Sequence, residues 1–159
     1  MCIRDRGYIG SHTVVELAAA GYEAIIVDNF SNSSPEVLER LETITGVNIP
    51  FYKGSISDKD LMNQIFEDNH IDAVVHLAAY KSVEESVREP LKYYENNVSA
   101  GIALLEVMKE HKVEHIIFSS SATVYGMNHG SSLTGDLSTS ATNPYGYTCL
   151  LYTSDAADD

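Results

Sequence analysis

Hydroxyl side chains and one tyrosine in the C-terminal part of the chain have the types and spacing of a proton-transfer site. Ser121 and Thr123 follow an apolar stretch, and Tyr145 comes later at the start of a helix-forming segment. A phenol has a pKa of about 10, so it needs a nearby cation to act as a base near neutral pH. A lysine one helical turn later would supply that charge, but position 149 holds Cys149. The alternatives are a packed aromatic ring and serines that only cap a loop.

A second group of residues has the pattern of a nucleotide site. Gly7 and Gly10 open a helix-forming stretch, and Asp28 ends the apolar run EAIIVD. An acid at this place accepts hydrogen bonds from an adenosine ribose and repels a 2′-phosphate, which favours NAD over NADP. The alternative is an acid that caps the turn after its strand. The glycine pair alone is a weak motif, because Arg4 stands where a first glycine is expected.

Lysine and histidine side chains are two further candidates for chemistry. Lys81 follows the apolar run at residues 72–79, where it is placed to meet a phosphate, although a solvated loop lysine is the alternative. His12 and His76 have no partner at metal-ligand spacing, so we predict that both are structural and that the chain has no metal site.

The elements that must position these residues follow from the hydrophobic pattern. Strand-like and helix-like segments alternate from residue 8 to about residue 118. Apolar runs predict strands at residues 23–28, 48–54, 72–79 and 114–121. Apolar residues at helical spacing lie between these strands. They predict a helix that Asp58 caps and a long amphipathic helix over 90–111. The alternation predicts an α/β fold with a doubly wound parallel, Rossmann-like sheet, which binds ligands at the carboxyl ends of its strands.

Composition narrows the class of protein. The 159 residues suffice for one domain with a substantial core, and 44% hydrophobic with 21% charged residues is ordinary for a globular protein. No apolar run is long enough to span a bilayer, so we predict no membrane partner. The formal net charge of -13 argues against a nucleic-acid partner. The two cysteines, Cys2 and Cys149, form no CxxC motif, which predicts incidental thiols and a cytoplasmic location.

The two ends do not fit this architecture. The N-terminal stretch MCIRDR would place Arg4, Asp5 and Arg6 in the central strand, where burying unpaired charges is costly, so we expect the first strand to be degraded or missing. The tail CLLYTSDAADD has no periodicity that continues the preceding helix. Both ends resemble translated adapter sequence from assembled environmental DNA, and we interpret residues 1–6 and 149–159 as anomalous.

Several stretches in the right order also carry a family resemblance. They are GYIGSHTVVEL, VDNFSNSSPEVLERL, HLAAYKSVEESVREPLKYYENNVSAG, FSSSATVYG and NPYG. Together they resemble the UDP-glucose/UDP-galactose 4-epimerases, a family of extended short-chain dehydrogenases/reductases. The resemblance implies a partial NAD-binding, Rossmann-like domain over residues 7–148, and it implies that a C-terminal substrate domain is absent from this chain.

The resemblance also implies a site for NAD and a UDP-sugar. Its catalytic residues would be Tyr145, as the base, with Ser121 and Thr123. Its cofactor-binding residues would be Gly7, Tyr8, Ile9, Gly10, Asp28, Asn29, Phe30, Ser31, Asn32, Ser33, Ser55, Ile56, Leu77, Ala78, Ala79, Tyr80, Lys81, Asn96, Ser121 and Tyr145. Ser55 departs from the acid that the family usually carries there, which weakens one adenine contact.

The implied reaction is epimerisation at C4 of a UDP-hexose. Tyr145 would take the 4-hydroxyl proton while hydride moves to NAD, and hydride would return to the other face of the 4-keto sugar. Related dehydratases carry an acid where Ala122 and Thr123 stand, so the sequence favours plain epimerisation. The family's lysine is expected at position 149, so we expect the full-length parent to be an enzyme and this truncated chain to be inactive.

Alternatives and partners remain open at this point. One rival is a non-catalytic NAD-binding module, and another is a different nucleotide-sugar enzyme such as a UDP-uronate 4-epimerase. The resemblance implies a homodimer for the full-length parent, with the helix over 90–111 as its interface.

Overall fold

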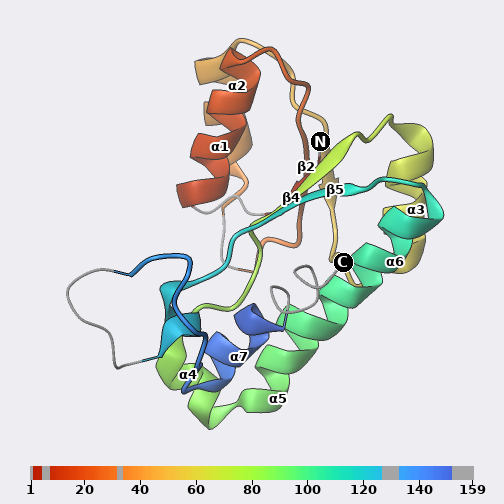
Figure 1. The fold of residues 1–159 in the computed structure, drawn as a ribbon. Coiled ribbons are helices and arrows are strands. Elements are labelled where there is room, and N and C mark those ends of the chain that lie inside the picture. The colour runs from red at the N-terminus through yellow and green to blue at the C-terminus, as the bar shows by residue number, and fades with distance from the viewer. Residues whose placement is uncertain (1, 5–7, 32–33, 127–132, 152–159) are drawn as a thin grey trace. The chain divides into compact units, whose positions relative to one another are not determined.

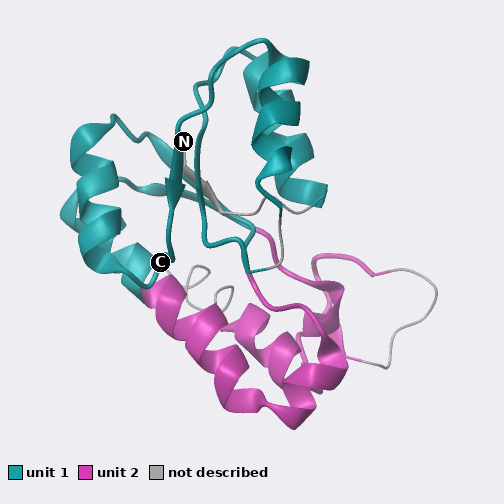
Figure 2. Ribbon diagram, turned by 180° about the vertical axis from the view of Figure 1, so that it is seen from behind, with its two compact units in different colours: residues 1–78, 103–118 teal, residues 79–102, 119–159 magenta. Residues whose placement is uncertain are grey.

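A computed structural model describes residues 2–4, 8–31, 34–126 and 133–151 of the chain. These residues cluster into two compact units, shown in Figure 2: unit 1 is 1–78 with 103–118, and unit 2 is 79–102 with 119–159. The elements in chain order are β1 (Cys2–Arg4), α1 (Tyr8–Ala19), β2 (Ile25–Asp28), α2 (Glu36–Thr45), β3 (Phe51–Lys53), α3 (Lys59–Asp68), β4 (Ala73–His76), α4 (Val83–Arg88), α5 (Pro90–Tyr93), the π-helical η1 (Tyr94–Ser99), α6 (Ala100–Glu110), β5 (His115–Phe118), the 3-10 helix η2 (Ala122–Tyr125) and α7 (Pro144–Leu150).

The strands of unit 1 form one parallel sheet in the order β3-β2-β1-β4-β5. Each of the four predicted strands is present with narrower bounds, and all four residues of β2 are buried. The order reverses beside β1, because the chain first adds β2 and β3 on one side and then β4 and β5 on the other. The predicted doubly wound α/β sheet is therefore confirmed.

The N-terminal stretch corrects one expectation. A first strand is not missing: β1 lies at the centre of the sheet and pairs with both β2 and β4. Strand pairing uses main-chain N–H and C=O groups, so a stretch without the composition of a buried strand can still complete both ladders. The expectation placed Arg4, Asp5 and Arg6 together in the strand. Only Arg4 lies in it, at the last position, and Asp5 and Arg6 lie outside the described residues.

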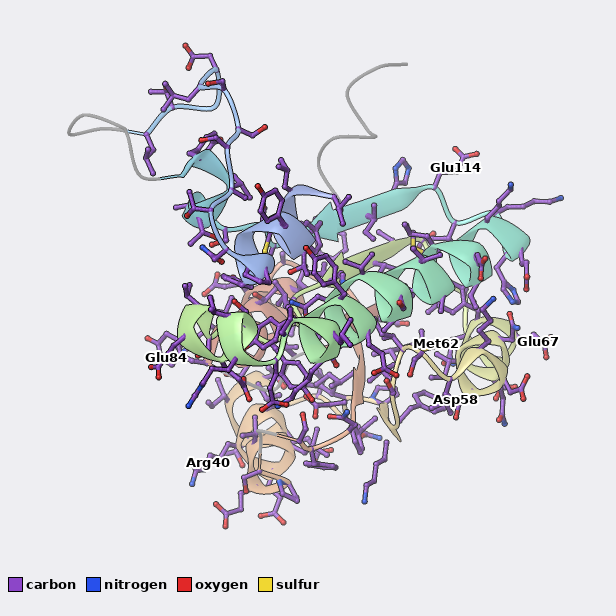
Figure 3. The ribbon with its side chains drawn as sticks, turned by 90° about the horizontal axis from the view of Figure 1, so that it is seen from below. Arg40, Asp58, Met62, Glu67, Glu84 and Glu114 are labelled. Carbon is purple, nitrogen blue, oxygen red and sulfur yellow. The ribbon has the colours of Figure 1, made fainter. Side chains whose placement is uncertain are left out.

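Helices cover both faces of the sheet in unit 1. Figure 1 shows α1 and α2 on one face and α3 with the later part of α6 on the other. The first face buries Val14, Ile26 and Leu41 in one apolar cluster. On α3, Met62 is buried while Glu67 is exposed and points outward in Figure 3. This amphipathic pattern follows from the spacing of apolar residues along each helix.

Side-chain capping fixes where α3 begins. The Asp58 carboxylate accepts a hydrogen bond from the backbone N–H of Leu61 at 3.1 Å. Such a bond satisfies one of the N–H groups that a helix start leaves without an intrahelical partner. The sequence prediction that a helix starts at Asp58 is confirmed.

The helix predicted over 90–111 is not regular. It consists of α5, the π-helical segment η1 and α6, so the hydrogen-bond pattern changes in its middle. The side chains that it buries include Tyr93, Asn97 and Leu104, whereas Leu91 is 82% exposed and Ile102 is 51% exposed. Its apolar stripe therefore lies partly on the surface.

None of the helices in the described part of the chain is both long and apolar enough to cross a bilayer.

Candidate functional site

The predicted site residues divide between the two units. Unit 1 carries Tyr8, Ile9, Gly10, Asp28, Asn29, Phe30, Ser31, Ser55, Ile56, Leu77 and Ala78. Unit 2 carries Ala79, Tyr80, Lys81, Asn96, Ser121, Thr123 and Tyr145. The remaining three, Gly7, Asn32 and Ser33, lie outside the described residues.

Asp28 stands at the carboxyl end of β2 and is buried. Its Oδ1 accepts a hydrogen bond from the backbone N–H of Phe30 at 2.6 Å. Phe30 has a φ of 59°, in the left-handed region that L-residues rarely adopt, so this bond helps to hold a strained turn. Asp28 therefore caps the turn after its strand, which was one of the two alternatives that the sequence left open. Its binding to a ribose stays a prediction.

The start of α1 has the properties of an anion-binding helix end. Tyr8 is 81% exposed and Ile9 is more than half exposed, whereas Gly10 is buried. The first turn contains no acidic residue. Backbone N–H groups and the helix dipole favour negative charge at such an end, so the residues present fit a pyrophosphate.

The turn after β2 is flanked by an aromatic pair. The rings of Phe30 and Phe51 meet edge to face, with centroids 5.3 Å apart, and the Lys53 ammonium lies 5.8 Å from the Phe30 centroid. By contrast, Ile56 is buried, and the Ser55 hydroxyl accepts a hydrogen bond from the Ser57 hydroxyl at 2.9 Å. Among these, Phe30 offers a partly exposed ring beside Asp28.

In unit 2, the start of α7 places Tyr145 in the first helical turn. The Asn143 side chain caps the helix by accepting a hydrogen bond from the N–H of Gly146 at 2.8 Å, and Pro144 stands at its first position. Gly146 allows close packing, because a Cβ there would lie 3.1 Å from the backbone oxygen of Thr123. The cap and the glycine together bring α7 against η2.

That packing brings the three predicted catalytic side chains together. The Thr123 hydroxyl donates to Ser121 Oγ at 3.0 Å, and Ser121 Oγ also accepts from the N–H of Thr123 at 3.3 Å. The Ser121 hydroxyl lies near enough to the phenol of Tyr145 to lower its pKa. The result is a cluster of three neighbouring hydroxyl groups, of the kind that proton transfer to or from a substrate requires.

The phenol of Tyr145 is not activated as a base in this chain. Burial of the side chain raises the pKa of Tyr145, the bond with Ser121 lowers it, and the neighbouring Cys149 raises it. Cys149 lies within α7, one turn after Tyr145, is 3% exposed, and has its own thiol pKa raised by burial. A neutral thiol therefore occupies the place at which a cation would favour the phenolate.

Sequence reasoning missed the buried amide of Asn97. Its Oδ1 accepts from the N–H of Tyr80 at 2.9 Å, and its Nδ2 donates to the carbonyl of Tyr80 at 3.0 Å and to Thr148 Oγ1 at 3.1 Å. Thr148 Oγ1 donates onward to the carbonyl of Tyr145 at 2.7 Å. One side chain thus joins the segment after β4 to the helix that carries Tyr145.

A signal for Asn97 existed in the sequence. The position falls on the buried face of its helix, in step with Tyr93, Ala100 and Leu104, all of which are buried. A polar residue in such a register must find hydrogen-bond partners. The neighbouring Asn96, which the resemblance favoured, is half-buried and donates to Asn97 Oδ1 at 2.9 Å.

The remaining candidates show no second site. His12 packs against the ring of Tyr8, and His76 packs against the ring of Phe118. Within the described residues, no group of three or more His, Cys, Asp and Glu side chains is placed to hold a metal ion. A cavity of about 600 Å³ in unit 1 opens beside Ile25, where β2 begins, at the opposite end of the strand from Asp28.

Comparison with known proteins decides the family. Residues 5–155 match the NAD dependent epimerase/dehydratase family over most of the chain. The chain belongs to the NAD dependent epimerase/dehydratase family. The family match confirms the resemblance seen in the sequence, and the solved structures confirm the Rossmann-like fold.

The chain is similar in sequence to UDP-glucose 4-epimerases. It is 50% identical over 145 residues to that of Bacillus subtilis (strain 168), covering 91% of this chain and 43% of the relative. It is 51% identical over 144 residues to that of Dictyostelium discoideum, covering 91% and 42%. The chain therefore spans less than half the length of these relatives.

Solved structures agree with the sequence relatives. The UDP-glucose 4-epimerase of Bifidobacterium longum, in complex with NAD+ and UDP, superposes with a TM-score of 0.92 at 45% identity, over 96% of this chain and 47% of the other. That of Stenotrophomonas maltophila, with bound NAD and formylated UDP-arabinopyranose, gives 0.94 at 42% identity, over 99% and 47%.

The Asn97 network makes a stability prediction. The substitution Asn97→Ala leaves the backbone groups of Tyr80 and the hydroxyl of Thr148 without their buried partner, and we expect it to cost about 2–4 kcal/mol in the free energy of unfolding. Asn96→Ala is the matched control and should cost less than about 1 kcal/mol. Urea denaturation measures both, and equal losses would contradict the central role of Asn97.

The environment of Tyr145 makes a titration prediction. The substitution Cys149→Lys introduces a cation one turn away, which favours the phenolate, so the pKa of Tyr145 should fall. Ultraviolet absorbance against pH, compared in each case with the same chain carrying Tyr145→Phe, isolates this phenol from the other tyrosines. Cys149→Met is the neutral control, and a pKa that falls equally in both variants would show that charge is not the cause.

Proposed function

We propose that this chain is the cofactor-binding part of a longer enzyme that interconverts UDP-glucose and UDP-galactose by epimerisation at C4. The observation that carries the proposal is the cluster of the Thr123, Ser121 and Tyr145 hydroxyl groups, which forms where η2 packs against the start of α7. Identity near 50% to UDP-glucose 4-epimerases supports it. Cofactor, substrate and partners are all proposed for the longer protein.

In this proposal unit 1 holds NAD. The N–H groups at the start of α1, at Tyr8 and Ile9, would face the pyrophosphate, and Asp28 would bind the adenosine ribose. Phe30 and its neighbours after β2 would line the adenosine. When bound, the nicotinamide accepts and returns a hydride.

Unit 2 would supply the acid–base groups. Tyr145 would hold the proton of the 4-hydroxyl group, and Ser121 would orient that hydroxyl while Thr123 fixes the Ser121 oxygen. The segment Ala79–Lys81 and Asn96 would line the cofactor. Ala122 and Thr123 supply no carboxyl group for elimination, which favours epimerisation over dehydration.

The chain by itself is proposed to be inactive. A phenol with a raised pKa stays protonated at neutral pH, and the thiol of Cys149 provides no positive charge to release the proton. The second candidate function, an NAD-binding module without catalysis, is favoured by the same observation. A UDP-uronate 4-epimerase stays an alternative for the longer protein, and a cytoplasmic location stays a prediction.

Cofactor binding is the first test of the proposal. Thermal unfolding of the chain should shift upward with NAD and less with NADP, because Asp28 repels a 2′-phosphate. At a concentration of NAD about 100 times its Kd, the stabilisation should be about 2.7 kcal/mol. Asp28→Asn keeps an acceptor for the N–H of Phe30 but removes the charge, so the two cofactors should then bind more equally. No shift with either cofactor would overturn the proposal for this chain.

The longer protein is further proposed to be a homodimer. Leu91 and Ile102 are large apolar side chains that α5 and α6 leave exposed, and such residues are typical of buried interfaces. Ile102→Lys should shift a concentration-dependent dimer toward monomer in sedimentation velocity, because a charge would be buried. Glu110→Lys, exposed on the same helix, is the control. If the unsubstituted chain stays monomeric at high concentration, this helix does not dimerise it.

A further inference from the structure

The hydroxyl of Tyr93 makes two hydrogen bonds inside unit 2. Tyr93 ends α5 and is completely buried. Its oxygen accepts from the backbone N–H of Ser82 at 3.0 Å, and its proton is donated to Glu85 Oε2 at 2.8 Å. Donor and acceptor capacities are therefore both used, and both partners belong to the segment that follows β4.

Glu85 is itself held in place. Its other oxygen, Oε1, accepts from the Lys92 ammonium at 2.7 Å, and that ammonium lies 4.9 Å from the ring centroid of Tyr80. The carboxylate directs the phenol proton toward itself, which leaves the phenol lone pairs for Ser82. Burial and the bond to Glu85 raise the pKa of Tyr93, so its proton stays in place.

The ring of Tyr93 makes a second pair of contacts. Its centroid lies 5.6 Å from that of Tyr80 and 6.5 Å from that of Tyr145, the latter in an edge-to-face arrangement. Aromatic rings at these separations attract one another beyond simple burial. One side chain thus contacts both the turn that carries Lys81 and the proposed base.

We propose that Tyr93 is a positioning residue of the site: its hydroxyl, oriented by Glu85, fixes the turn Tyr80–Ser82, and its ring fixes Tyr145. The inference rests on the function proposed above, since that function gives the turn and the tyrosine their roles. Lys81 lies between two residues whose backbone is held from the same helical segment, Tyr80 by Asn97 and Ser82 by Tyr93. Such support pre-organises a site before its ligand arrives.

Packing alone does not account for these contacts. A phenylalanine would fill the same volume with the same ring, but it would leave the N–H of Ser82 without its acceptor. The two functions of Tyr93 therefore separate by substitution: Tyr93→Phe removes the hydroxyl, and Tyr93→Leu removes the ring as well.

Amide hydrogen exchange tests the hydroxyl. In Tyr93→Phe the exchange of the Ser82 amide should accelerate about tenfold, the size expected for loss of one hydrogen bond. Tyr94→Phe, at the next position, should leave that exchange unchanged. In Glu85→Ala the Ser82 amide should also exchange faster, and Glu85→Gln should restore protection because its amide oxygen accepts the same bond. Unchanged exchange in Tyr93→Phe, or no difference between the two Glu85 variants, overturns the role of the hydroxyl.

Ionisation of Tyr145 tests the ring. The absorbance titration should give the same pKa for Tyr145 in Tyr93→Phe as in the unsubstituted chain, and a lower one in Tyr93→Leu, since burial is what raises it. A Tyr145 pKa that shifts in Tyr93→Phe, or that stays constant in Tyr93→Leu, overturns the role of the ring. If Tyr93→Leu does not fold, Tyr93→Met, which removes the ring with a smaller loss of volume, takes its place in the same titration.

NAD binding separates positioning from simple stability. If the turn is part of the cofactor site, Tyr93→Phe should weaken NAD binding several-fold at a temperature where the variant is fully folded. Faster Ser82 exchange with unchanged NAD affinity would show a structural role only and overturn the positioning role. If the unsubstituted chain binds no NAD, the proposed function has failed, and exchange and titration still decide whether Tyr93 holds the turn and Tyr145.

Discussion

The requirement that a buried carboxamide satisfy all of its polar atoms governs the arrangement of unit 2. Asn97 is buried within a helical segment and uses its donors and its acceptor on Tyr80, Thr148 and Asn96. Burying an amide there without partners would cost about 1–3 kcal/mol for each unsatisfied group. The π-helical turn at η1 accompanies this residue, as such turns often accompany functional positions. The segment after β4 and the helix of Tyr145 are held by the same group.

In unit 1 the arrangement depends on hydrogen bonding between the main chains of neighbouring strands. β1 lies between β2 and β4, so its few residues complete ladders on two sides. Helices connect the outer strands to the rest of the sheet and cover both of its faces. This explains why a stretch with an unsuitable composition still takes the central place. Asp28 stands at the carboxyl end of β2, the edge at which parallel sheets bind ligands.

The sequence predicted the features that depend on residues close together along the chain, namely strands and helix starts. Apolar runs located four strands, Asp58 marked the start of α3, and Tyr145 was expected at the beginning of a helix. It did not predict contacts between distant segments. Tyr80 and Asn97 are 17 residues apart, and Asn97 and Thr148 are 51 apart. No local pattern encodes such pairs, and β1 was missed for the same reason, because its partners decide its conformation.

The burial of Cys149 has a consequence for how the chain can be studied. A thiol that is 3% exposed, on a short helix, reacts with an alkylating reagent only while that helix is transiently open. The rate of modification therefore reports the opening equilibrium of α7 under native conditions. Peptide mass spectrometry reads this site separately from Cys2. Cys149, which provides no positive charge beside Tyr145, thus serves as a chemical probe for local opening of α7, the helix that carries both residues.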